Sequence, residues 1–390
     1  MSEVTLRLLP FPSLYLHVGR FASKSGLYCI AVWCILRAMR LEVAPGLVFT
    51  PPAKRKFLGN HPRISVIIPT CNRMDSLRRC LDSIYCQSLS PEAFEVIVVN
   101  NCCTDRTVDL CAHYAQEHSN FLLVDEPIPG LLAARHAGWR AAAADVLTFC
   151  DDDIEAVPGW LETIDSIFSE QPDVYLVGGN CTGSFDADLP EWFAELWEEY
   201  DGLRMNRYYS LLEGVNSLKE VEPGIIFGCN FSARRSVWEE AGGAGPDCMA
   251  NMLFQGEGEN RVCDAASRVG RKAVLHPGAS VRHHMPANRL TLPYMRRRGI
   301  YASIGIGYSM FRYGYVHESL PPTLHILPGD NPALHAVAEG LRQGFLVYLE
   351  SLFENKALRE WVRYPTYFGA EAPPTESLME ASMLTQRLGW

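Results

Sequence analysis

The sequence lacks several features that would place it in a special class of protein. Its 13 cysteines include no C-x-x-C pair, and Cys102 and Cys103 are adjacent, so the usual spacings of zinc sites and disulfide frameworks are missing. It is not of low complexity, since 48% of its residues are hydrophobic and 21% are charged, as in globular proteins. We therefore predict a globular, cytoplasmic protein with reduced thiols.

The chain also has no overall excess of positive charge, because its formal net charge is -10. Basic residues nevertheless gather in residues 1–63, which hold nine Lys or Arg against only Glu3 and Glu42. The apolar run at 26–38 in this segment is shorter than the ~20 residues of a membrane-spanning helix. Residues 1–60 are predicted to be a basic extension whose helix either contacts the inner face of an anionic membrane peripherally or packs on the main domain. No nucleic-acid partner is predicted.

From Ile64 onward, apolar runs alternate with segments of helical periodicity. The runs at 64–69, 94–99, 121–124 and 144–150 are typical of strands, and helical patterns lie between them. This alternation predicts an α/β fold with a mostly parallel sheet, in which ligands bind beyond the carboxyl ends of the strands. Polar residues stand at those predicted ends, at 70–73, 100–101 and 151–153.

The triplet Asp151, Asp152 and Asp153 follows the last of these apolar runs. Three adjacent carboxylates repel one another unless a cation lies among their oxygens, and Mg²⁺ and Mn²⁺ prefer oxygen ligands. The alternative is an acidic loop that caps the helix beginning near Pro158. The triplet alone supports both interpretations equally.

Four ordered motifs resemble the nucleotide-binding half of family 2 glycosyltransferases. They are ISVIIPTCNR from Ile64, VIVVNNCCTDRT from Val96, GLLAARHAGWRAA from Gly130 and VLTFCDDD from Val146. The resemblance runs from about residue 64 to 308 and implies the GT-A fold, with a Rossmann-like sheet flanked by helices. It implies a catalytic domain at 61–290, divided into a nucleotide-binding half (61–155) and an acceptor half (156–290). A helical C-terminal region at 291–390 and a helical N-terminal extension complete the predicted organisation.

The resemblance also implies roles for residues of the donor half. Asn100 stands where the family usually has an aspartate that accepts a hydrogen bond from uracil. The Asn amide can still accept that bond, so a UDP-sugar is the expected donor. Because the amide can also donate, Asn100 does not fix the base. Asp105 is equally well explained as a carboxylate at a helix N-terminus. Asp153 is the predicted ligand of Mn²⁺ or Mg²⁺. The residues implied in nucleotide-sugar binding are Pro69, Thr70, Asn72, Arg73, Asn100, Asp105, Arg135, Asp151 and Asp152.

Glu257 and Glu259 occupy the place of the family's acidic acceptor motif, with Gly258 between them. An inverting transfer needs a base for the acceptor hydroxyl, and a carboxylate suits that task. We predict Glu259 as the base and Glu257 as its neighbour or a sugar contact, against the alternative of ordinary helix-start carboxylates. Further on, His283 and His284 end a predicted strand. The resemblance implies that one of them completes the metal site or contacts the diphosphate, and the sequence does not choose between them.

Other segments of the second half leave alternatives open. Residues 224–232 are predicted to form a further strand, and residues 228–235 resemble the family's G-x-N-F-x-x-R-R stretch near the donor sugar. The aromatic residues of 191–212 either contact an acceptor or belong to the core. Arg289 and the arginines at 296–298 either bind phosphate, bind anionic lipid or face solvent on a helix.

The predicted function is that of an inverting, metal-dependent glycosyltransferase. It would move a sugar from a nucleotide diphosphate to a hydroxyl of a glycan or a lipid-linked acceptor. The alternative is a catalytically weak glycan-binding or scaffold protein of the same fold, suggested by Asn100 and Gly258. A metal-dependent phosphatase or nucleotidyltransferase would explain the aspartates but not the four ordered motifs.

Overall fold

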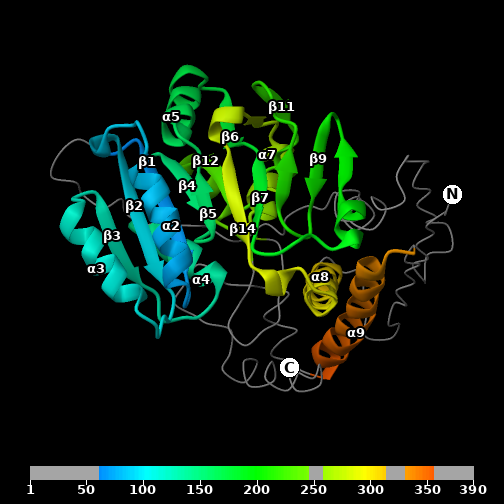
Figure 1. Cartoon of the computed structure of the whole chain (residues 1–390). Coiled ribbons are helices and arrows are strands. Elements are labelled where there is room, and N and C mark those ends of the chain that lie inside the picture. Colours follow the sequence, from blue (N-terminus) through cyan, green and yellow to red (C-terminus); the bar gives the residue numbers. More distant parts are fainter. Residues whose placement is uncertain (1–60, 246–257, 313–329, 355–390) are drawn as a thin grey trace.

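The computed structural model describes residues 61–245, 258–312 and 330–354, which are built around an eight-stranded sheet (Figure 1). Its strand order is β11-β13-β6-β12-β4-β1-β2-β3. The strands are β1 (Ile64–Thr70), β2 (Phe94–Asn100), β3 (Phe121–Asp125), β4 (Val146–Cys150), β6 (Val174–Gly178), β11 (Lys219–Val221), β12 (Asn230–Arg234) and β13 (Lys272–Leu275).

The first four strands in sequence form a continuous parallel block. β1 pairs in parallel with both β2 and β4, and β2 pairs in parallel with β3. β12 runs antiparallel to both β4 and β6, whereas β13 is parallel to β6. The carboxyl ends of β1 to β4 therefore meet at one edge of the sheet, as the polar residues after each apolar run predicted.

Helices cover this sheet where the sequence has helical periodicity. In α2, the residues spaced three and four apart, Leu77, Cys80, Leu81 and Ile84, are all buried. α4 packs closely on β1 and β2, because a side chain at Gly138 would collide with Ile67. The helices are α2 (Met74–Tyr85), α3 (Thr107–Glu117), α4 (Leu131–Ala141), α5 (Trp160–Glu170), α6 (Arg235–Ala241), α7 (Asn260–Arg268), α8 (Leu292–Arg312) and α9 (Pro332–Glu354), with the 3-10 helices η1 (Pro91–Ala93), η2 (Glu191–Leu196), η3 (Pro223–Ile225), η4 (Pro277–Ala279) and η5 (Ala287–Arg289).

A second sheet has six strands, of which β5 directly follows the aspartate triplet and the other five lie between residues 181 and 285. Its order is β5-β14-β7-β10-β9-β8, and β14 pairs with β5 on one side and with β7 on the other. The two sheets together bring the end of β4 close to β14. The strands are β5 (Ile154–Ala156), β7 (Cys181–Phe185), β8 (Glu198–Tyr200), β9 (Leu203–Asn206), β10 (Leu211–Glu213) and β14 (Val281–Met285).

The C-terminal helices α8 and α9 pack against each other and below β14 (Figure 1). Their backbones approach closely, because a side chain at Gly299 would meet the Val337 carbonyl and one at Gly340 the Arg296 carbonyl. A second hydrophobic cluster joins these helices to the second sheet through residues such as Phe193, Tyr209 and Met285. No helix in the described ranges is long and apolar enough to cross a membrane.

Several sequence predictions need correction or fall outside the described residues. The strand expected over 224–232 is the 3-10 helix η3 followed by a turn, and β12 begins only at Asn230. The aromatic segment 191–212 forms η2 and short strands, with Phe193 and Tyr209 buried in the core and Tyr200 exposed. The predicted interfacial helix in residues 1–60, Glu257 and the tail after 354 lie outside the described part of the chain.

Candidate functional site

The aspartate triplet lies at the carboxyl end of β4, where the chain crosses from the first sheet to β5 of the second. Asp152 points toward the loop after β1. Its Oδ2 accepts a hydrogen bond from Thr70 Oγ1 at 2.7 Å, and its Oδ1 accepts one from Arg73 Nη1 at 2.9 Å. Asp152 thus joins the first predicted nucleotide loop to the triplet and uses both oxygens in doing so.

Asp151, Asp153 and His283 form the group that can hold a metal ion. One ligand atom from each lies within 4.8 Å of the others. Asp153 Oδ1 is buried, lies 3.2 Å from His283 Nε2 and accepts no hydrogen bond from the described residues. Two carboxylates and an imidazole suit Mn²⁺, and an unsatisfied buried oxygen is the expected state of a metal ligand. The residues therefore fit the predicted metal site.

The three aspartates have different electrostatic surroundings. Burial raises the pKa of Asp152 to about 6, although Arg73 opposes the shift. Burial also raises the pKa of Asp151, against the opposing charge of Arg135. For Asp153, burial is outweighed by His283, Arg289 and Arg73, which hold its pKa below the ordinary value. Asp153 therefore carries the most stable negative charge of the triplet, as a metal ligand requires.

His283 and His284 project from β14 in different directions, because successive side chains of a strand alternate. His284 Nε2 lies 3.2 Å from Asp186 Oδ2, away from the triplet, and only its backbone N–H reaches the Asp153 carbonyl, at 2.8 Å. The cluster includes His283 and excludes His284. Burial alone would lower the pKa of His283, but without a metal Cys229 and Asp153 beside it raise that pKa to about 10. A metal ion held by this imidazole would therefore have to displace a proton from it.

Arg289, from η5, also enters the site. Its Nη2 donates a hydrogen bond to Asp153 Oδ2 at 2.9 Å, and Tyr209 Oη donates to the Arg289 carbonyl at 2.9 Å. The predicted arginine cluster is therefore divided. Arg296 pairs instead with Glu339 of α9 at 3.1 Å, and the Arg297 guanidinium lies over the ring of Tyr294.

Glu259 is the N-cap residue of α7, but its side chain makes no hydrogen bond to that helix. Its Oε1 accepts a hydrogen bond from the Gly228 N–H at 2.9 Å, and its Oε2 accepts one from Arg135 Nη1 at 3.2 Å. Arg135 is buried, and its Nη2 lies 3.7 Å from Asp151 Oδ1. The arginine of α4 therefore links the predicted base to the triplet, although 124 residues separate it from Glu259.

The two predicted nucleotide loops hold each other in place. Asn72 adopts a left-handed conformation (φ 55°), and its Oδ1 accepts hydrogen bonds from the backbone N–H groups of Thr104 and Asp105. Asp105 accepts from the N–H groups of Thr107 and Met74, at the starts of α3 and α2. Asp105 thus serves helix N-termini, as the alternative interpretation expected. Pro69 lies within β1, in register with Val99.

Asn100 is the last residue of β2, and Asp125 is the last residue of β3 directly beside it. Asn100 Nδ2 donates to Asp125 Oδ1 at 2.8 Å, and Asn100 Oδ1 accepts from the Cys103 N–H at 3.0 Å. Asp125 was not among the predicted site residues, although it follows the predicted strand 121–124 just as Asn100 follows the strand 94–99.

The G-x-N-F-x-x-R-R segment is mostly structural. Asn230 is buried, accepts from Trp160 Nε1 and donates to the Ala279 carbonyl. Arg234 donates to backbone carbonyls around α5, and Arg235 donates to those of Ala142 and Ala144. The Gly228 N–H of this segment donates a hydrogen bond to Glu259.

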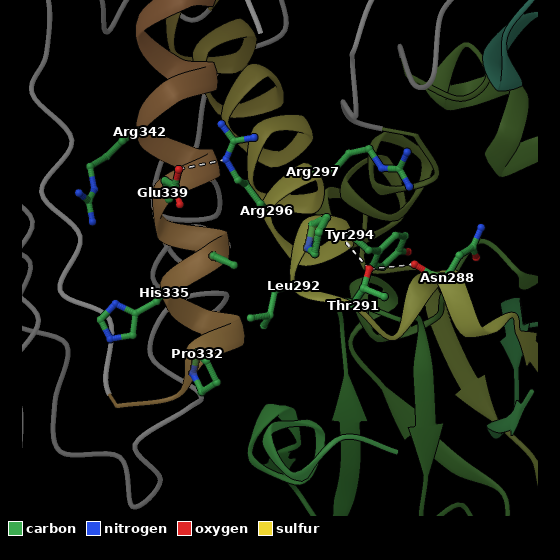
Figure 2. Close-up of a pocket in the computed structure, with 12 residues that line it drawn as sticks. Asn288, Thr291, Leu292, Tyr294, Arg296, Arg297, Pro332, His335, Glu339 and Arg342 are labelled. Carbon is green, nitrogen blue, oxygen red and sulfur yellow. Dashed lines mark hydrogen bonds and ion pairs between the residues drawn. The ribbon is translucent and has the colours of Figure 1, made fainter. Parts of the chain in front are cut away.

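A cavity of about 890 Å³ lies between the first turns of α8 and α9 and is also lined by Asn288 of η5. Figure 2 shows its arginines on different faces of the two helices, with Arg296 joined to Glu339 and Thr291 to Asn288. Because Arg297 and Arg342 point in different directions in this view (Figure 2), they do not form one anion-binding centre.

Comparison with protein families matches residues 65–240 to the model for glycosyl transferase family 2. This segment contains the carboxyl ends of β1 to β4, the triplet and Arg135. Residues 65–240 are a family 2 glycosyltransferase domain. Its α/β architecture with a parallel block of strands agrees with the predicted fold class, so the predicted family and the α/β class are confirmed for this domain.

Curated relatives match this domain over part of their length. Glycosyltransferase AglE of Haloferax volcanii is 32% identical over 120 residues, which is 30% of this chain and 39% of AglE. The glucosyl-dolichyl phosphate glucuronosyltransferase of the same organism is 26% identical over 184 residues, or 46% of this chain and 55% of the relative. The chain thus spans about half or less of these relatives.

Solved structures are similar over most of the chain at low identity. A mannosyltransferase from Pyrobaculum calidifontis, in complex with GDP-Man and Mn²⁺, is 16% identical with a TM-score of 0.45, and 93% of each chain is covered. TarS 1-349 of S. aureus is 14% identical with a TM-score of 0.41, over 84% of this chain and 92% of TarS.

Proposed function

We propose that the family 2 domain transfers a sugar from a nucleoside-diphosphate donor to a hydroxyl of a glycan or lipid-linked acceptor, with inversion at the anomeric carbon. The observation that carries the proposal is the contact between the nucleotide loop, the metal group and Glu259. Thr70 and Arg73 bind Asp152, and Arg135 lies between Asp151 and Glu259. A donor site and a candidate base are thereby joined through the aspartate triplet, by hydrogen bonds and by the ion pair between Arg135 and Asp151.

The donor diphosphate would lie at the triplet. Asp151, Asp153 and His283 would hold Mn²⁺ or Mg²⁺, which supplies positive charge to the leaving diphosphate. Arg73 and Arg289, which donate to Asp153, lie close enough to that position to bind phosphate oxygens as well. These guanidiniums would fix the orientation of the donor before the reaction.

Glu259 would take the proton from the acceptor hydroxyl. Its Oε1 is oriented by the Gly228 N–H and its Oε2 by Arg135, so the carboxylate is held in one position rather than moving freely at the start of α7. Asp186 and Glu198 are further carboxylates of the acceptor half, but they pair with His284 and Arg207. Among the carboxylates of this half that the structure describes, Glu259 is the one that contacts Arg135 beside the triplet.

The test is turnover of a panel of nucleotide sugars by the full chain with Mn²⁺, followed as release of nucleoside diphosphate with and without glycan or lipid-linked acceptors. Glu259→Gln keeps an oxygen for Gly228 but cannot accept the proton. We expect its rate to fall roughly 10²- to 10⁴-fold while donor binding is retained. Asp153→Ala should lose both turnover and donor binding.

Asp186→Asn is the matched control, because it removes a carboxylate that lies outside the network. Its turnover should stay close to that of the unaltered protein. A Glu259→Gln variant with full activity would refute Glu259 as the base. A chain that binds donors but never transfers would instead support the glycan-binding alternative.

A further inference from the structure

The imidazole of His283 turns one of its two nitrogens toward the triplet. Its Nε2 lies 3.2 Å from Asp153 Oδ1, whereas its Nδ1 is buried and forms no hydrogen bond within the residues that the structure describes. A neutral histidine that binds a metal through one nitrogen carries its proton on the other. That proton normally has an acceptor, which fixes the tautomer and the orientation of the ring. His283 Nδ1 therefore needs an acceptor among the side chains around it.

The thiol of Cys229 lies beside this imidazole. β12 begins with Asn230 opposite Cys150 of β4, so Cys229, one residue earlier on an antiparallel strand, comes next to the first aspartate of the triplet. The thiol is buried, and contact with Cys181 and burial raise its pKa. His283 opposes that rise, as expected of an imidazole within reach of the sulfur. Cys229 is therefore a side chain that Nδ1 can use.

The proton of the Cys229 thiol has acceptors of its own. Cys229 Sγ lies 3.8 Å from the Ser210 carbonyl oxygen and 3.8 Å from Cys181 Sγ. A thiol is both a weak donor and a weak acceptor. When its S–H points to the Ser210 carbonyl, the lone pairs of the sulfur can accept a hydrogen bond from the imidazole.

The inference rests on the proposed function, in which His283 holds the metal. We propose that Cys229 is a positioning residue for His283, in which His283 Nδ1–H donates to Cys229 Sγ and the thiol donates to the Ser210 carbonyl. This chain of hydrogen bonds keeps the remaining proton on Nδ1 and turns the lone pair of Nε2 toward the ion. The neighbouring Gly228 N–H orients Glu259. One turn of the chain thereby holds both a metal ligand and the candidate base.

The test is calorimetric titration of the full chain with Mn²⁺. Cys229→Ala removes the acceptor of Nδ1, and the affinity should fall at least about tenfold, as is usual when the partner of a metal-binding histidine is lost. Cys229→Ser keeps one atom that both accepts and donates, so its affinity should stay within about threefold of that of the unaltered protein. Urea unfolding of the metal-free proteins shows that each variant is folded.

Cys181→Ala is the matched control, because it truncates the other thiol of the same buried pair. Its affinity for Mn²⁺ should change by about twofold or less. An unchanged affinity in Cys229→Ala, or an equal loss in Cys181→Ala, would overturn the assignment and leave glycosyl transfer standing. A loss of about tenfold or more in Cys229→Ser would also overturn it, because packing would then explain both variants. An unaltered chain that binds neither Mn²⁺ nor Mg²⁺ would contradict this assignment and the metal-dependent function together.

Discussion

At the scale of single residues, the candidate site is defined by arginines that lie between carboxylates. Arg73 contacts Asp152 and Asp153, Arg289 contacts Asp153, and Arg135 lies between Asp151 and Glu259. Buried or half-buried carboxylates need such partners, because an unpaired charge away from water is costly. The same guanidiniums are suitable ligands for a diphosphate, so in the proposed function one set of residues would serve both stability and binding.

The histidine pair offers a direct comparison of two adjacent residues. We expect His283→Ala to weaken Mn²⁺ binding at least about tenfold, because it removes a nitrogen from the metal group. His284→Ala should change the affinity by about twofold or less, because this imidazole pairs with Asp186 instead. Calorimetric titration of the two variants with Mn²⁺ measures both. Equal losses in the two variants would contradict the assignment of His283.

At the scale of elements, the site forms where two sheets meet. β4 supplies the triplet, β14 supplies His283, and η5 carries Arg289 at the start of α8. The Tyr209 hydroxyl, between β9 and β10, donates a hydrogen bond to the Arg289 carbonyl of η5. The C-terminal helices are therefore linked to the metal group through the η5 turn that precedes them.

β8 of the second sheet contains a titratable group in an unusual environment. Burial raises the pKa of Glu198 to about 7, even though Arg207 opposes the shift. In the unfolded chain the carboxyl ionises near its ordinary pKa of about 4.3. As the pH rises from about 4 to 7, the unfolded state therefore ionises while the folded state keeps its proton, and the free energy of unfolding falls.

Glu198→Gln removes this titration. Between about pH 5 and pH 8, the unaltered protein should lose up to about 2 kcal/mol of unfolding free energy relative to the variant. Urea unfolding of both proteins at the two pH values checks this difference, because all other titrating groups are shared. If the gap between the two proteins is the same at both pH values, Glu198 does not titrate in this range.

At the scale of the whole molecule, local patterns predicted the parallel block and its edge. The apolar runs that precede Thr70, Asn100 and the triplet form β1, β2 and β4 in the structure. These strands could be predicted because the spacing of apolar residues and the positions of turn residues depend on local structure. The contacts that complete the site join distant residues. Arg289 meets Asp153 across 136 positions, and no local pattern reveals such a pairing.

One error of the sequence interpretation and one choice that it left open have physical explanations. The strand expected at 224–232 was placed too early, because the turn at Gly228 presents its N–H to Glu259 instead of to a neighbouring strand. The histidine pair could not be separated, because the side of a strand that faces the site depends on its register with β5 and β7. Both depend on partners far away in the sequence.

In the proposed function, the metal group and the nucleotide loops form one donor site. Titration of the full chain with UDP and GDP, once with Mn²⁺ and once with a chelator, measures this directly. For whichever nucleotide binds more tightly, we expect at least about tenfold tighter binding with Mn²⁺, and Asp153→Ala should abolish this difference. Equal affinity with and without the metal, or a metal effect that survives Asp153→Ala, would contradict it.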